Sequence, residues 1–331
     1  MSKKNCENAS ACAKKTSIGG QALIEGVMMR GPKRTAMTVR DPDGNLVVEC
    51  WDNEENTRAK FFELPVVRGV FNFIDSMRSG YKCLMRSAEI AGLEDPEEDK
   101  KEEGGDEKKE KKDSSALMNV LMIVSMVLAV FLAVGLFIAL PSFLYTLLGK
   151  WIPFFSPERR FVRALFEGVL KIVVLVGYLS LVSLMKDIRR TFMYHGAEHK
   201  TIFCYESGLE LTVENVRGQK RFHPRCGTSF LIIIVIVSIL VSLLIPTEFG
   251  AWAVPTYLRV AIKLLLLPLI MGVGYELIKF AGRYDNLLTR IISTPGVWLQ
   301  KLTVFEPDDD MIECAISSMK EVIPEDGSDK W

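Results

Sequence analysis

The chain's three histidines lie in two short segments that also carry other residues able to bind a metal ion. His195 and His199 stand four residues apart in the string YHGAEHK, with Glu198 between them, and His223 and Cys226 follow in the string HPRCGTSF. Side chains four residues apart lie on one face of a helix, so the imidazoles at 195 and 199 can converge on one ion. Imidazole and thiolate suit zinc and similar divalent metals. We therefore expect a divalent metal ion, zinc, at these residues.

The same string reads H-x-x-E-H, the inverted form of the zincin motif. In that interpretation Glu198 lies beside the metal and acts as general base for a water molecule. His223 supplies a third ligand, and Cys226 can approach the same ion. Two other interpretations stay open: a solvated helix face without metal, or a closed, purely structural site with four protein ligands. Those four ligands would be His195, His199, His223 and Cys226.

Runs of nearly uninterrupted apolar residues indicate a membrane protein, because a helix in lipid must satisfy its own backbone groups. Four such runs occur, at about 117–140, 168–185, 228–246 and 257–278. The apolar stretch after the first run contains Pro141, Gly149 and Pro153, which predicts an interfacial or re-entrant connection. The fold class expected is thus a polytopic α-helical membrane protein with about four transmembrane helices.

Lys and Arg in the loops predict the orientation of these spans. Basic residues are frequent at 108–112 and 186–227 and absent from 247–256, which places both termini and the histidine loop in the cytoplasm. Residues 1–17 are polar with no apolar core, so the first span is expected to direct targeting. The seven cysteines show no regular framework, which argues against a disulfide-stapled domain. The lipid bilayer is the expected partner, and no nucleic acid is expected.

The chain divides into five segments by composition. The pattern predicts a β-hairpin over 35–51 around Pro42-Asp43-Gly44, and a helix over 64–91 with apolar residues at helical spacing. These elements form a small cytoplasmic α+β N-terminal region, and two further helical patterns follow the last span. The segments are a disordered tail at 1–16, the α+β region at 17–92, a charged flexible linker at 93–116, a membrane domain at 117–280 with the histidine loop at 186–227, and cytoplasmic C-terminal helices at 281–331.

Two other features could contribute to the site. Glu276, with Lys279, lies near the cytoplasmic end of the last span, where charge is costly unless it is paired or functional. Glu276 is therefore a candidate fourth metal ligand or a partner of a ligand. The segment GGQALIEGVMMRGP at 19–32 lacks the lysine and hydroxyl of a phosphate-binding loop, and we interpret it as turns leading into a sheet.

The strings GGQALIEGVMMRGP, YHGAEHK and HPRCGTSF, in this order around membrane spans, resemble the bacterial YqhQ-like family of predicted metal-dependent membrane enzymes. The resemblance extends from about Ser17 to Val322. It implies a multi-pass protein of the bacterial cell membrane whose histidine motifs contain the metal-binding candidates named above. It also implies that Glu25 or Arg30, which lie in the glycine-rich motif, faces the same site.

The hypothesis that follows is a membrane-embedded, metal-dependent hydrolase at the cytoplasmic face. Glu198 would accept a proton and Arg30 would bind an anionic group, with Glu25 as a further catalytic candidate. Lipid-linked molecules and membrane peptides are both possible substrates. The alternative is a non-enzymatic scaffold with a closed metal site. A transporter is weaker, because the predicted spans hold little charge apart from Glu276 and Lys279.

Overall fold

The structure, a computed structural model, describes residues 15–53, 60–93, 120–121, 124–156, 159–246, 248–249, 252–284 and 286–330. The chain forms two compact units. The first contains residues 1–96, 178–234 and 271–331, and the second contains 97–177 and 235–270. The expected charged linker lies outside the described residues from 94 onward, and so does the expected disordered tail up to residue 14. Thr16, which we placed in that tail, is instead buried and forms a β-bridge with Lys330.

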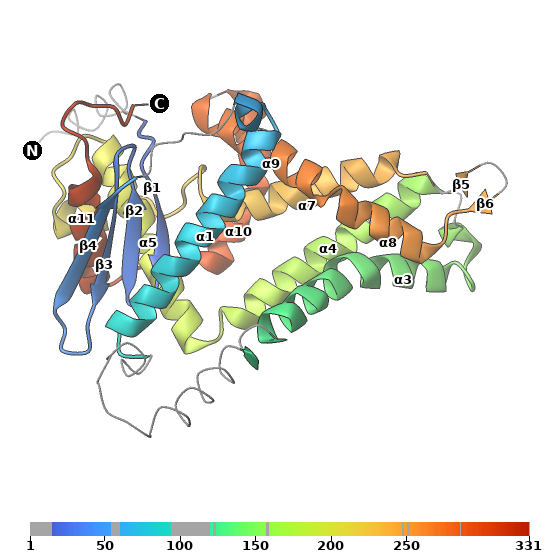
Figure 1. The fold of residues 1–331 in the computed structure, drawn as a ribbon, viewed down its shortest axis with the longest axis horizontal. Coiled ribbons are helices and arrows are strands. Elements are labelled where there is room, and N and C mark those ends of the chain that lie inside the picture. The colour runs from blue at the N-terminus through green and yellow to red at the C-terminus, as the bar shows by residue number, and fades with distance from the viewer. Residues whose placement is uncertain are drawn as a thin grey trace, which may run out of the picture. The chain divides into compact units, whose positions relative to one another are not determined.

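A four-stranded antiparallel sheet organises the first unit, with its strands in chain order (Figure 1). They are β1 (Gly19–Leu23), β2 (Gly26–Arg30), β3 (Arg34–Arg40) and β4 (Leu46–Asp52). The predicted hairpin over 35–51 is confirmed as β3 and β4, and Gly44 adopts a φ of +88° in its turn. The glycine-rich segment is itself the β1–β2 hairpin.

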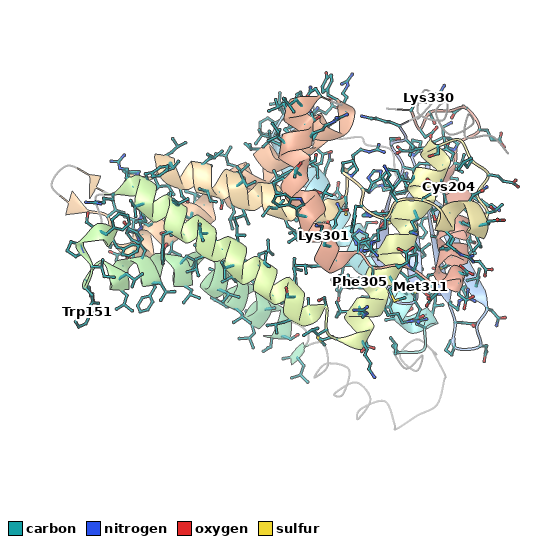
Figure 2. The ribbon with its side chains drawn as sticks, turned by 180° about the vertical axis from the view of Figure 1, so that it is seen from behind. Trp151, Cys204, Lys301, Phe305, Met311 and Lys330 are labelled. Carbon is teal, nitrogen blue, oxygen red and sulfur yellow. The ribbon has the colours of Figure 1, made fainter. Side chains whose placement is uncertain are left out.

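Helices cover both faces of this sheet. The 3₁₀ turn η3 (Lys60–Glu63) precedes α1 (Val67–Ile90), which confirms the predicted helix and packs on β1 and β3. Helices α5 (Lys186–Glu206) and α11 (Asp309–Val322) pack on β1, β2 and β3. Because side chains alternate along a strand, Met28 of β2 joins the core with α1, whereas Val27 and Met29 join the core with α5 and α11. Cys204 and Met311 belong to that second core (Figure 2).

The segment expected as a histidine loop is mostly regular structure. It consists of α5 and the short helix α6 (Val213–Arg217), and it ends at α7 (Gly227–Leu244). The C-terminal helices α10 (Leu287–Thr303) and α11 confirm the two helical patterns after the last span. Helix α10 begins with a capping box formed by Asn286 and Thr289, and it contains Pro295 in its interior.

Three helices are long and apolar enough to cross a membrane by length and composition: Val124–Leu148, Arg160–Val182 and Gly227–Leu244. A fourth span is possible if α8 (Thr256–Leu265) and α9 (Leu267–Arg283), which meet at an angle of 47°, count as one bent element. The prediction of about four spans is therefore confirmed in part: three helices qualify by length and composition, and a fourth only if the bent pair is one span. The second unit also contains the 3₁₀ turn η6 (Pro153–Phe155) and a small hairpin of β5 (Glu248–Phe249) and β6 (Trp252–Ala253).

The first span does not end at residue 140 as predicted. It continues through the π-helical turn η5 (Gly135–Ala139) and α3 (Leu140–Leu148), which contains Pro141. Proline lacks an N–H and its ring clashes with the carbonyl four residues earlier, and a widened turn before it relieves that clash. The interfacial or re-entrant connection proposed for this stretch was wrong up to Leu148.

The second span also differs from its prediction. Helix α4 (Arg160–Val182) begins eight residues before position 168 and includes Arg163 and Glu167. These two residues, Lys171 on the same helix, and Lys263 of α8 are all buried. The expectation that the spans hold little charge was therefore wrong, because averaging over a long apolar window conceals charged residues that share one helix face.

Candidate metal centre

The histidine pair on α5 and the cysteine before α7 lie together. His195 and His199 face the same way, one helical turn apart, and their ring centroids are 4.4 Å apart. Nε2 of His195 lies 3.1 Å from Sγ of Cys226. One potential ligand atom from each of these three residues lies within 4.8 Å of the other two. Two imidazoles and a thiol at this separation fit a tetrahedral zinc ion, whose ligand bonds are about 2.0–2.3 Å long.

Backbone carbonyls orient both rings. Nδ1 of His195 is 3.0 Å from the carbonyl oxygen of Thr303, and Nδ1 of His199 is 2.6 Å from that of Arg221. A proton on each Nδ1 completes these hydrogen bonds and leaves each Nε2 with a free lone pair. Metal-binding histidines usually have such a second partner, which fixes the tautomer and the direction of the ring. Both imidazoles therefore have the second partner that metal-binding histidines usually have.

Gly196 permits one of these contacts. A Cβ at this position would lie 2.0 Å from the carbonyl oxygen of Phe305, so only glycine lets the segment after α10 pack directly on α5. The Phe305 N–H donates to the carbonyl of Phe192, which holds the segment in place. This packing brings the Thr303 carbonyl to His195. Gly196 therefore allows the close packing that positions the Thr303 carbonyl, and this role could not be predicted from the sequence around it.

Glu198 lies beside the three metal-binding candidates. One of its carboxylate oxygens is 3.9 Å from Nε2 of His195, and the residue is 5% exposed. Burial raises the pKa of this carboxyl, while His195 and the backbone N–H of Gly20 act in the opposite direction. A Cβ on Gly20 would lie 2.7 Å from Cγ of Glu198, so the β1 glycine allows strand and carboxylate to meet. Glu198 is thus held close to the histidines by both α5 and β1.

A cavity of about 420 Å³ opens onto this group of residues. Its walls come from β1 and the segment before it, from α5, and from the segment between His223 and Thr228. His195, Glu198, His199 and Cys226 all line it. A small molecule or the end of a larger one can therefore reach the candidate metal ligands and the buried carboxylate together.

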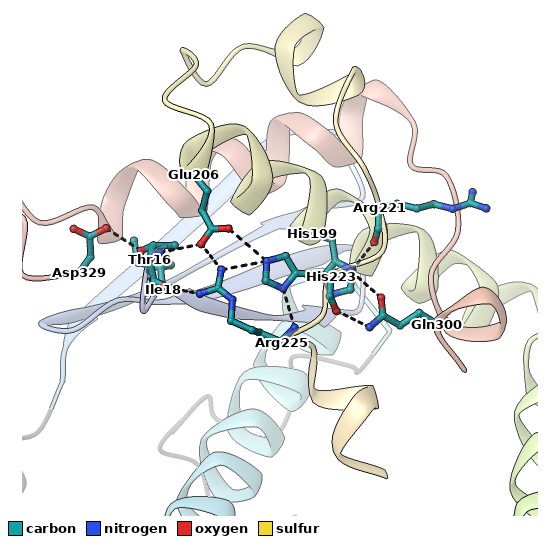
Figure 3. Close-up of polar contacts among 9 residues, drawn as sticks. All are labelled: Thr16, Ile18, His199, Glu206, Arg221, His223, Arg225, Gln300 and Asp329. Carbon is teal, nitrogen blue, oxygen red and sulfur yellow. Dashed lines mark hydrogen bonds and ion pairs between the residues drawn. The ribbon is translucent and has the colours of Figure 1, made fainter. Parts of the chain in front are cut away.

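His223 does not join the three-ligand group, contrary to the expectation that it would be the third ligand. Its ring centroid is 5.7 Å from that of His199, and its side chain lies between Glu206 and Arg225 (Figure 3). The backbone N–H of Arg225 donates to Nδ1 of His223 at 3.3 Å. Thr16 joins this network through its N–H to Glu206 and its carbonyl to Arg225. The His223 ring is therefore already occupied by protein contacts.

Gln300 positions the segment that carries His223. Its side-chain oxygen accepts the N–H of His223 at 2.8 Å, and its amide donates to the carbonyl of the same residue at 2.7 Å (Figure 3). Gln300 is fully buried. Sequence reasoning missed it, because a lone glutamine 77 residues away carries no spacing signal.

Burial lowers the pKa of His223 to about 4, and Arg225 and His199 act in the same direction while Glu206 opposes them. The folded protein thus binds a proton at His223 less readily than the unfolded chain, in which histidine titrates near pH 6.5. This contribution to stability is fully present above pH 6.5 and is lost as the pH falls toward 4. We expect a loss of about 2 kcal/mol between pH 7 and pH 5.

The measurement is thermal unfolding of the detergent-purified protein with a chelator present, so that loss of metal does not contribute. The apparent melting temperature of the wild type should fall over this interval, and that of His223→Gln should fall less. If the apparent melting temperatures of the two proteins fall equally between pH 7 and pH 5, His223 does not contribute to the pH dependence of stability.

Glu276 is not near the histidines in the contacts that the structure describes. Its carboxylate pairs with the guanidinium of Arg68 on α1 in a two-point ion pair, with Nε of Arg68 at 2.7 Å. The backbone N–H of Val66 lies 3.5 Å from the same carboxylate. We expected Glu276 to be a metal ligand or a partner of one. In the structure it instead forms an ion pair with Arg68, and this pair joins α9 to α1.

The two candidates in the glycine-rich motif lie apart from each other. Glu25, in the β1–β2 turn with a φ of 51°, pairs with Arg190 and accepts a hydrogen bond from Tyr194 at 3.1 Å. It does not line the cavity described above. Arg30, at the exposed end of β2, lines a second cavity of about 510 Å³. The two cavities share Ser17, Gly19, Gly20 and Gln21 as lining residues. Arg30 thus lies on the other side of β1 from Glu198.

Comparison with known proteins assigns the chain to a family. A family model described as a protein of unknown function (DUF1385) matches residues 64–325, which include all the histidines. The chain is 36% identical over 309 residues to "Uncharacterized protein YqhQ" of Bacillus subtilis (strain 168), covering 93% of this chain and 92% of that protein. No solved structure matches the chain. The resemblance drawn from the three sequence strings is thereby confirmed for the family alone: the chain belongs to the DUF1385 family and is similar to YqhQ.

Proposed function

We propose that this protein is a multi-pass membrane hydrolase that depends on a divalent metal ion, zinc, held by His195, His199 and Cys226. The observation that carries the proposal is the pair of Nδ1 contacts to backbone carbonyls, which leaves both Nε2 atoms free for a metal ion, together with the 3.1 Å between Nε2 of His195 and Sγ of Cys226. Imidazoles that merely face solvent have no need for such fixed tautomers. The proximity of three different ligand atoms supports the same conclusion.

The number of ligands favours an enzyme over a closed scaffold site. Structural zinc sites usually have four protein ligands, whereas catalytic sites have three and an open position. Among the described residues the group contains three, because His223 is engaged by Glu206 and Arg225. The open side of the group faces the 420 Å³ cavity. This arrangement leaves room for a substrate.

Each residue of the site has a role in this proposal. When bound, zinc would polarise a substrate carbonyl or phosphoryl group and make water more acidic. Glu198 is placed to accept a proton in the cavity, and its burial suits a base that must work near neutral pH. Thr303 and Arg221 hold the two imidazoles through their carbonyls. Arg30, across β1, is available for an anionic part of a substrate that extends into the second cavity.

The membrane setting restricts the substrates. The apolar helices support insertion in the bacterial cell membrane, and the loop charges favour cytoplasmic termini with the site at the cytoplasmic face. An enzyme so placed has access to lipid-linked molecules and to membrane peptides, which are the substrate classes that we propose.

The test of the metal centre is analysis of the detergent-purified full chain. We expect about one equivalent of zinc per chain, and an X-ray absorption spectrum with two nitrogen ligands and one sulfur ligand at zinc–protein bond lengths of about 2.0–2.3 Å. A fourth ligand that is not from the protein should complete the shell. Absence of a transition metal after purification without chelator, and no uptake on addition of zinc, would contradict the proposal.

A further inference from the structure

The second unit contains a cluster of buried charges, which is separate from the metal centre. Arg163, Glu167 and Lys171 lie at successive four-residue intervals on α4, and Arg259 and Lys263 lie at the same interval on α8. This spacing places each set on one face of its helix. All five residues are 7% exposed or less. We call these residues the basic cluster.

Within the cluster, the carboxylate of Glu167 is fully engaged. It accepts a hydrogen bond from Ser142 at 2.9 Å and from Nε of Arg163 at 3.1 Å, and it pairs with Nζ of Lys263. Lys263 also donates to Ser142 at 2.9 Å. The Glu167 carboxylate therefore already binds two cations and a hydroxyl group. It has little capacity left to balance other charges.

The remaining cations lack a buried counter-charge. Lys171 donates to the hydroxyl of Ser238 at 3.1 Å, and Arg259 donates to the carbonyl of Pro246 at 2.9 Å. Four cations face one carboxylate among the described buried residues of this unit, which leaves an excess of three positive charges. A lysine can release its proton when buried, but a guanidinium keeps its charge at any physiological pH. An excess of positive charge therefore persists whatever the state of Lys171.

Two guanidinium nitrogens in the cluster are also unsatisfied. Nη2 of Arg163 and Nε of Arg259 are buried, and neither has a hydrogen-bond partner in the part of the chain that the structure describes. Arg163 is 5% exposed and Arg259 is 2% exposed. Buried polar groups in native proteins are nearly always paired, so each exception calls for an explanation. Two charged donors with spare N–H groups in one cluster indicate a binding partner that is an anion.

Beyond Arg160, the rest of α4 is apolar where it is exposed. Phe161, Leu165, Val169 and Val173 lie exposed on the rest of α4, as expected for a surface that faces lipid. At 1.5 Å per residue, Lys171 lies roughly 16 Å along the helix from Arg160. Charges at such positions are rare in membrane helices, and they mark pathways or ligand sites.

We propose that the basic cluster binds a phosphate group. A planar guanidinium with several N–H donors matches the tetrahedral oxygens of phosphate, and lysine adds a point charge. A phosphate monoester carries up to two negative charges, which offsets most of the positive excess. The group can belong to a lipid head or to free inorganic phosphate, and the two sources share this chemistry. The inference does not depend on the metal centre.

The experiment uses the full chain, purified in detergent and stripped of lipid. Phosphatidic acid, which carries a phosphate monoester, is compared with diacylglycerol of the same acyl chains, and inorganic phosphate is compared with chloride. Binding is followed by native mass spectrometry and by thermal stabilisation. We expect phosphatidic acid or inorganic phosphate to bind, and diacylglycerol and chloride to have no effect. Binding of the lipid alone assigns a headgroup site, and competition by inorganic phosphate assigns a site for the free ion.

Variants connect binding to the cluster. Arg259→Gln and Lys171→Gln should each weaken phosphate binding roughly 10- to 100-fold, because each removes a charge-assisted hydrogen bond. Lys150→Gln, at an exposed position just after α3, is the control for loss of a cation outside the cluster and should bind as the wild type does. Lys171 has a hydroxyl partner rather than an ion pair, so its variant keeps the test valid if Arg259→Gln fails to fold. Equal binding by the wild type and a folded cluster variant, or no binding of either phosphate source, would overturn the proposal.

Discussion

Glu198→Gln should leave the metal centre intact and abolish the reaction. The amide keeps the shape of the side chain, and the proposed ligands His195, His199 and Cys226 are unchanged. What the variant loses is the group that accepts a proton, and a general base contributes about 10²–10⁴-fold to a reaction rate. The carboxylate is buried and 3.9 Å from Nε2 of His195, so no solvent-exposed acid can replace it.

The measurement does not require the substrate to be known in advance. Membrane lipids and peptides are profiled in three strains: wild type, gene deletion, and a chromosomal Glu198→Gln replacement. The replacement strain should accumulate the same compounds as the deletion, although its membranes contain the protein in normal amount and with normal metal content. That accumulated compound is then the candidate substrate.

Glu210→Gln is the matched control for this experiment. Glu210 follows α5 in the chain but is exposed, so its variant should give a wild-type profile. If Glu198→Gln also gives a wild-type profile while the deletion does not, Glu198 is no catalytic base. The scaffold interpretation, in which this acid only supports the ligands, would then be preferred.

The sequence predicted those parts of the site that depend on local spacing. His195 and His199 share a face because a helix repeats every 3.6 residues, and both lie on α5. The hairpin of β3 and β4 was predictable from its turn residues, because Pro42, Asp43 and Gly44 suit few other conformations. In both cases a few neighbouring residues determine the local structure.

The parts that could not be predicted depend on long-range partners. Glu276 was a candidate ligand because a charge near a membrane needs a partner, but the sequence does not say that the partner is Arg68, 208 residues away. Whether His223 or Cys226 is the third ligand also depends on distant residues. Gln300 fixes the backbone of His223. Glu206 and Arg225 contact its ring. These contacts arise only when α5, α10 and the segment before α7 have packed.

The last prediction separates the three proposed ligands from His223. Cys226→Ala and His199→Ala should each lose bound zinc, because removing one of three ligands leaves a site with two. Changes to residues that only support the ligands cost about 10–100-fold in metal affinity, and the loss of a ligand should cost more. His223→Gln removes an imidazole of the same sequence motif that already contacts Glu206 and Arg225. It should retain most of the zinc.

The measurement is zinc per chain, and zinc affinity by competition with a chelator, for the four proteins purified in parallel at neutral pH. Membrane abundance and elution as a single species show whether each variant folds. Because the proposed site has three ligands and opens onto a cavity, the protein should stay folded when Cys226→Ala removes the metal. Loss of zinc from His223→Gln as large as from Cys226→Ala, with loss of the folded protein in both, would instead indicate a closed four-ligand site. In such a site the metal holds the segment between α5 and α7 in place and performs no chemistry.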